Sequence, residues 1–181
     1  MVYTGDMPEV LHVSLDNEAA VTAYYSSIDF NRKLMGNLFT ASAALFHVQT
    51  HYEDGADEQI RAETEAGRQM LIAHTHSQFI DPLVLASMVE RESALHEIGE
   101  RGIVVPGRSK LFNSGIYGGV IRNSGVAIPV YLRKDHPDAS REEIQEANKS
   151  QIKIVTARMN RGEHAAIYPE GSVGDCLEKI G

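Results

Sequence analysis

The chain has 181 residues, 43% hydrophobic and 23% charged, with a formal net charge of −8. This length suits one domain, and the composition is typical of a soluble globular protein and excludes a fibrous or disordered chain. Because nucleic-acid binding depends on clustered Lys and Arg, the acidic charge argues against a nucleic-acid partner. The single cysteine, Cys176, cannot form an internal disulfide, which fits a reducing compartment.

The first 48 residues are expected to form an N-terminal helical segment. Residues 1–15 lack the basic start and long apolar stretch of a signal peptide, so we expect no secretion signal. Residues 17–47 carry apolar side chains at helical spacing, with Gly36 as the expected weak point.

The most apolar window, residues 34–48, is too short and too polar to span a bilayer, which needs about 20 apolar residues. Two interpretations remain open for it. Arg32 and Lys33 precede the apolar residues, as in a helix that lies in the membrane interface. Alternatively, the apolar stripe packs on the core of the domain.

Residues 49–181 are expected to form the main domain, in which strands and helices alternate. The apolar runs predict strands at residues 44–52, 69–74, 103–107, 126–132 and 164–168, and the strand at 69–74 is expected to be buried. The polar or periodic segments predict helices at residues 57–67 and 82–102, a glycine-interrupted helix or loop at 108–125, and a helix after Ser140. This alternation predicts an α/β fold with a mostly parallel central sheet covered by helices.

The helix after Ser140 has the clearest sequence signals. Ser140 and Glu143 have the spacing of a capping box, in which each side chain satisfies a free backbone N–H of the first turn. Its apolar residues predict one buried stripe, formed by Ile144, Ile152, Val155 and Met159.

A histidine-rich stretch, LIAHTHSQFIDPL, joins the strand at 69–74 to the following helix. Catalytic loops of parallel sheets lie at this kind of junction. The Asp81 carboxylate can hold one ring nitrogen of His76 protonated and leave the other nitrogen as a base toward a hydroxyl. The alternative is that His76 and Asp81 only cap the start of the helix.

The same stretch allows a metal site as a competing interpretation. His74 and His76 have the spacing of the His-x-His ligands of zinc hydrolases, and Asp81 is the third candidate ligand. No Cys or His cluster completes the ligand set in the sequence, so we expect no metal.

A second segment, AAIYPEGS, follows the last expected strand. Pro169 fixes the exit from the strand, Glu170 is presented at its tip, and Gly171 allows close approach of a ligand. The Glu170 carboxylate can accept hydrogen bonds from substrate hydroxyls. The alternative is an ordinary turn, because Pro-Glu-Gly is favourable turn chemistry.

A third segment, residues 107–135, supplies cations at strand ends beside several glycines. Such groups can bind a phosphate, and the candidates are Arg108, Lys110, Arg122 and Arg133. The alternative is a solvated basic face.

Taken in this order, the three segments resemble the PlsC-like glycerophospholipid acyltransferase family, which includes 1-acyl-glycerol-3-phosphate acyltransferase. HSQFID matches the His-x4-Asp motif of that family, residues 107–135 resemble its middle block, and RMNRGEHAAIYPEGS resembles its third block. The resemblance covers about residues 31–172. Because relatives continue with another strand and a fourth motif, we expect the domain at 49–181 to lack its C-terminal part.

The resemblance implies transfer of a fatty acyl group from acyl-CoA or acyl carrier protein to a lysophospholipid-type acceptor, with glycerol 3-phosphate or a glycolipid as alternatives. It implies that His76 is the general base and Asp81 its orienting partner. It also implies that the acceptor is bound by Lys110, Arg133, Glu170 and Gly171.

The implied reaction needs no metal and no cofactor besides the acyl donor, because a thioester is already activated. The implied partners are the acyl donor and the lysolipid acceptor. The resemblance also implies peripheral contact with a membrane, and hence a cytoplasmic protein at the inner face of the membrane.

Overall fold

The structure is a computed structural model that describes residues 12–74 and 81–168. In chain order its elements are η1 (Leu15–Asn17), α1 (Glu18–Ser27), α2 (Arg32–Leu45), α3 (Ala56–Glu65), β1 (Leu71–Ala73), α4 (Asp81–Arg91), α5 (His96–Arg101), β2 (Ile103–Arg108), α6 (Ser109–Phe112), α7 (Gly115–Ser124), β3 (Ala127–Val130), η2 (Arg133–Asp135), α8 (Arg141–Asn160) and β4 (His164–Ile167).

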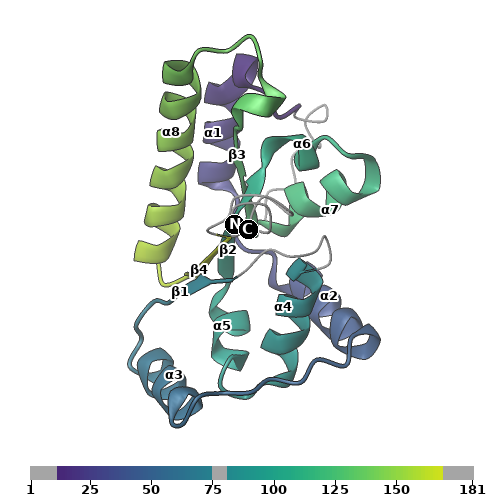
Figure 1. Cartoon of the computed structure of the whole chain (residues 1–181), viewed down its shortest axis with the longest axis vertical. Helices are drawn as coiled ribbons and strands as arrows, with labels where there is room; N and C mark the ends of the chain where they lie inside the picture. The colour runs from purple at the N-terminus through teal and green to yellow at the C-terminus, as the bar shows by residue number, and fades with distance from the viewer. Residues whose placement is uncertain (1–11, 75–80, 169–181) are drawn as a thin grey trace, which may run out of the picture.

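The strands form one parallel sheet in the order β1-β4-β2-β3. The predicted α/β fold with a parallel sheet and an N-terminal helical segment is therefore confirmed. Figure 1 shows α1 and α8 side by side in the upper part of the molecule, and α2, α4 and α5 in the lower part. The carboxyl ends of all four strands share one edge of the sheet, because the strands are parallel.

Helices cover both faces of the sheet, and alternate strand residues point to each face. One face carries Val104 and Ala165, together with a cluster from α1, α6, β3 and α8 that includes Val21, Tyr25, Phe112, Ile128, Ile144 and Ile154. The other face carries Ile103 and Ala166, together with a cluster from α2, α4 and α5 that includes Met35, Phe39, Leu85, Val89 and Ile98.

Pro106 explains why the sheet divides toward its carboxyl edge. Strand β2 pairs with β4 only at Ile103 and Val104, and then pairs with β3 alone as far as Arg108. The N–H of Val105 points to β3, where it donates to the carbonyl of Val126 (2.8 Å). The next position would direct its N–H toward β4, and proline has none. Beyond Val104 the sheet therefore continues as two pairs of strands, β1 with β4 and β2 with β3.

The N-terminal segment breaks at residues 28–31 and not at the predicted weak point, Gly36, which lies within α2. The break is fixed by Asn31, whose side chain accepts a hydrogen bond from the N–H of Leu34 (3.1 Å) and caps α2. The backbone N–H of Asn31 donates to the carbonyl of Ser124 (2.9 Å), which ties the break to the end of α7.

The apolar face of α2 packs on α4 and the sheet. Met35 and Phe39 are buried in the second cluster, as the core-packing interpretation expects. Residues 44–52 do not form the predicted strand, because α2 continues to Leu45 and the following residues have no regular structure. Within residues 12–74 and 81–168, no helix is long and apolar enough to cross a bilayer.

Two predictions about burial are wrong. The strand predicted to be buried at 69–74 is reduced to β1, which lies at the edge of the sheet, and Leu71 is 59% exposed. On α8, the predicted capping box of Ser140 and Glu143 is present. Ile152, predicted to be buried, is 60% exposed, because the face that meets the sheet and α1 is centred on other residues: Ile144, Ala147, Gln151, Ile154 and Arg158.

Candidate active site

The candidate site lies at the edge where the four strands end. Hydrogen-bonded strands are about 4.8 Å apart, so each pair at this edge, β1 with β4 and β2 with β3, brings two carboxyl ends within about 5 Å of each other. In parallel sheets, loops that leave this edge supply the functional groups. All three segments singled out in the sequence leave the sheet here, after β1, after β4 and after β2.

The chains that lead to the first two segments leave the sheet side by side. The backbone N–H of His74, just after β1, donates to the carbonyl of Ile167 (3.0 Å). The ring of His74 meets the ring of Tyr168 edge to face, with centroids 5.8 Å apart. Three predicted site residues follow these positions but lie outside the described residues: His76, Glu170 and Gly171.

Asp81 is placed at the same edge. It is the first residue of α4, and its side chain is buried at 6% exposure. A carboxylate is favoured at the start of a helix, where backbone N–H groups carry partial positive charge. Burial, the charge of Asp81 and the nearby Tyr117 together raise the pKa of Tyr168 to about 12. Asp81, Tyr117 and Tyr168 are therefore neighbours, although they come from α4, α7 and the end of β4.

The other half of the edge, formed by β2 and β3, is dominated by an ion pair. Arg108, the last residue of β2, donates from Nε and Nη2 to both carboxylate oxygens of Asp135 in η2. The hydrogen bonds from Arg108 hold the pKa of Asp135 below its usual range, and the charges of Lys110 and His136 act in the same direction. Arg108, Lys110 and His136 therefore surround the Asp135 carboxylate beside the strand ends.

The four candidate phosphate ligands have different environments. Arg108 is occupied by Asp135, and Arg122 donates to the backbone carbonyl of Phe112. Lys110 on α6 and Arg133 at the start of η2 are exposed and make no hydrogen bond or ion pair with the described part of the chain. Lys110 and Arg133 are thus the two cations of this set that a ligand can reach.

One glycine of the third segment, Gly118, allows α6 and α7 to pack closely. A Cβ atom on Gly118 would lie 2.5 Å from the carbonyl oxygen of Phe112, so only glycine fits there. Gly118 lies in the first turns of α7, next to Tyr117, which acts electrostatically on Tyr168.

Sequence reasoning did not single out Tyr117, Asp135 or Tyr168 as members of the site. Tyr168 lies directly before the Pro-Glu-Gly segment, so its position in the motif was an available signal. Asp135 is 27 residues from Arg108, and Tyr117 is 36 residues from Asp81, so their proximity depends on the fold and has no local signal.

The described residues contain no group of three or more His, Cys, Asp or Glu side chains that could hold a metal ion. His76, one of the three ligands in the competing zinc interpretation, lies outside the described residues.

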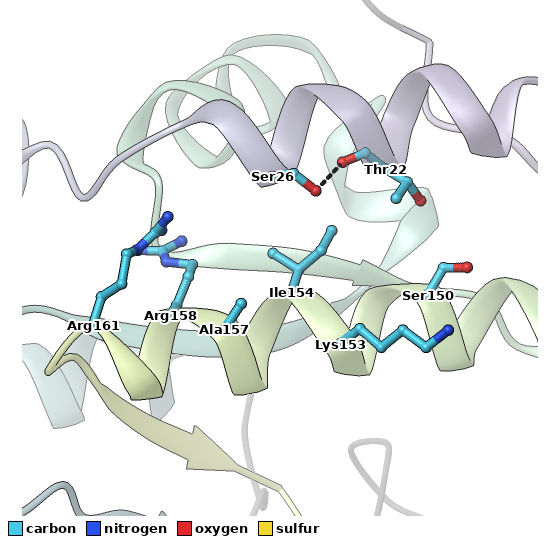
Figure 2. Close-up of a pocket in the computed structure, with 8 residues that line it drawn as sticks. All are labelled: Thr22, Ser26, Ser150, Lys153, Ile154, Ala157, Arg158 and Arg161. Carbon is cyan, nitrogen blue, oxygen red and sulfur yellow. Dashed lines mark hydrogen bonds between the residues drawn. The ribbon is translucent and has the colours of Figure 1, made fainter.

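A cavity of about 440 Å³ lies away from the strand ends, between α1 and α8 (Figure 2). It is lined by Thr22, Ser26 and Lys153, and by Arg158, which is held by Glu163 at 2.9 and 3.0 Å. The described residues that line it include no histidine, cysteine or carboxylate to exchange a proton. We therefore place the candidate active site at the carboxyl edge and not in this cavity.

Comparison with known proteins gives one match. A family model described as Acyltransferase matches residues 51–178, a range that includes all three segments of the candidate site. No curated protein and no solved structure matches the chain.

Proposed function

The chain belongs to the acyltransferase family, and from this we propose that it transfers a fatty acyl group from acyl-CoA or acyl carrier protein to a lysophospholipid-type acceptor. The first candidate acceptor is 1-acyl-glycerol-3-phosphate, and glycerol 3-phosphate or a glycolipid are the alternatives. The observation that carries the proposal is the position of Asp81, a buried carboxylate at the edge where the motif segments leave the sheet.

In the proposed mechanism, His76 removes the proton of the acceptor hydroxyl while its other ring nitrogen donates to Asp81. The hydroxyl oxygen attacks the thioester carbon, a C–O bond forms and the C–S bond breaks. The proton passes from His76 to the leaving thiolate, which departs as a thiol. The buried position of Asp81 supports this role, because a carboxylate shielded from water orients and stabilises an imidazolium strongly.

The proposed acceptor site uses Lys110, Arg133, Glu170 and Gly171. Lys110 and Arg133 are exposed cations at the ends of β2 and β3, and a phosphate on the acceptor would be attracted to both. In this scheme the protein needs neither a metal nor a cofactor besides the acyl donor. We also propose that it works as a peripheral protein at the cytoplasmic face of a membrane, where lysolipid acceptors reside.

The test is thiol release from a long-chain acyl-CoA, measured with and without 1-acyl-glycerol-3-phosphate, for the wild type and His76→Ala. We expect acceptor-dependent release that His76→Ala reduces by about 10²–10⁴-fold. His96→Ala is the matched control, because His96 is an exposed histidine on α5.

Release that persists in His76→Ala would contradict the proposed role of His76. Release of thiol that does not depend on any acceptor would contradict transferase activity. Stoichiometric zinc in the purified protein would favour the alternative, a metal-dependent hydrolase that uses His74, His76 and Asp81.

A further inference from the structure

The charges of this acidic protein are unevenly distributed along the chain. Residues 101–134 contain six Lys or Arg and no Asp or Glu, so all 25 acidic residues lie elsewhere. Arg101 and Arg122 donate to backbone carbonyls, and Arg108 is paired with Asp135. The remaining three cations are exposed and lie near the carboxyl ends of β2 and β3: Lys110, Arg133 and Lys134.

Exposed apolar side chains occur in the same part of the chain. Ile116 is 91% exposed and Tyr117 is 40% exposed, and both belong to the first turn of α7. Helices α6 and α7 pack on each other and project from the sheet toward the right of Figure 1. An isoleucine exposed to this extent gains nothing from the fold, whereas it gains free energy if another apolar phase covers it.

This apolar turn borders the candidate active site. Tyr117 is close enough to Tyr168 to contribute to the raised pKa of that phenol, and Asp81 acts on the same phenol. A molecule that covers Ile116 and Tyr117 would therefore lie beside the candidate active site.

We propose that Lys110, Ile116, Tyr117, Arg133 and Lys134, together the α7 surface, dock the protein on an anionic phospholipid bilayer. Ile116 enters the interface between headgroups and acyl chains, and the three cations contact headgroup phosphates. The proposal rests on acyl transfer to a lipid acceptor, because docking here brings that acceptor to the site.

Two observations favour this surface and this partner. On α2, the other membrane candidate, Met35 and Phe39 are buried against α4, and the exposed Leu45 lies at the opposite end of the helix from Arg32 and Lys33. The α7 surface combines an exposed isoleucine with cations, and a nucleic acid would use the cations but not Ile116. The first acidic residue after the basic range, Asp135, is neutralised by Arg108 and does not oppose docking.

The test is sedimentation of the full chain with vesicles of phosphatidylcholine alone and with vesicles that also contain phosphatidylglycerol. We expect binding to the anionic vesicles, and we expect Ile116→Ser to weaken it by about 10-fold or more. Ile152→Ser is the matched control, because Ile152 is also an exposed isoleucine, on α8. Lys134→Ala should weaken binding by about 5-fold, whereas Lys153→Ala on α8 should leave it unchanged.

Three outcomes would overturn the docking proposal: no binding of the wild type to anionic vesicles, equal losses for Ile116→Ser and Ile152→Ser, or binding that salt abolishes and Ile116→Ser does not change. The last outcome would indicate a purely electrostatic site of the kind that nucleic acids occupy. Acyl transfer to an acceptor dispersed in detergent separates the two proposals. Binding without transfer contradicts the proposed function alone, and transfer without binding contradicts the docking alone.

Discussion

The buried carboxylate of Asp81 lies close to the phenol of Tyr168, and its charge contributes to raising the pKa of that phenol to about 12. The two residues come from the first turn of α4 and the end of β4, so the sheet edge brings together two segments about 90 residues apart. The phenol therefore stays neutral at neutral pH. A carboxylate with a neutral phenol beside it and little water around it acts strongly on any cationic partner.

We expect Asp81→Asn to reduce kcat by about 10²–10⁴-fold, because an amide can neither hold the correct imidazole tautomer nor stabilise the imidazolium. Thiol release from acyl-CoA measures this effect. Circular dichroism checks that the fold is kept, and Asp57→Asn on the exposed surface of α3 is the control. Full activity of a folded Asp81→Asn variant would contradict the assigned role.

A second prediction concerns the Arg108–Asp135 pair. Asp135 is 9% exposed and Arg108 is 32% exposed, so the two charges are only partly screened by water. We expect a double-mutant cycle of Arg108→Gln and Asp135→Asn to give a coupling energy of about 1–2 kcal/mol in urea unfolding at neutral pH. A coupling near zero would show that the pair does not stabilise the η2 segment.

Much of the fold was predictable because its signals are local. The apolar runs at residues 103–107, 126–132 and 164–168 each form a strand, and the spacing of Ser140 and Glu143 marks the start of α8. These signals depend on side-chain period and capping, which act over a few residues.

Most errors concern positions whose burial is determined by contacts with residues far away in the sequence. Gln151 and Arg158 are buried on α8, although a hydrophobic pattern cannot select them. Gln151 donates to the hydroxyl of Thr22 (2.7 Å), and Arg158 donates to the backbone carbonyl of Gly125. Residues 44–52 resemble a strand in the sequence because Phe46 directly follows the apolar end of α2. For the candidate site, the sequence predicted Asp81 and the cations as members, but it could not show which of the cations are already paired.

A third prediction concerns Gly125, which ends α7 with a φ of 66°. A Cβ atom there would lie 2.2 Å from the backbone oxygen of Asp29, so both the conformation and the space require glycine. We expect Gly125→Ala to destabilise the protein by about 2–4 kcal/mol. Gly36→Ala, within α2 with nothing within 4 Å of the added Cβ, should stabilise it by about 0.5–1 kcal/mol. Thermal unfolding of both variants tests these two expectations, and equal changes in stability would contradict them.

The last prediction concerns His164, a fully buried histidine that begins β4. Its Nδ1 accepts a hydrogen bond from the backbone N–H of Met70 (3.1 Å), which links the start of β4 to the entry of β1. Burial, with a smaller effect from Arg101, lowers the pKa of His164 from 6.5 to about 4. Between these two values the unfolded chain binds more protons than the folded one. The stability present above pH 6.5 is therefore lost as the pH falls toward 4.

From this linkage we expect the free energy of unfolding to fall by about 1–2 kcal/mol between about pH 7.5 and about pH 5 through His164 alone. His164→Gln keeps a hydrogen-bond acceptor but does not titrate, so its unfolding free energy should depend less on pH by this amount. His96→Gln, at an exposed position on α5, should retain the pH dependence of the wild type. Urea unfolding at both pH values measures all three proteins, and a His164→Gln profile parallel to the wild type would show that His164 is not the titrating group.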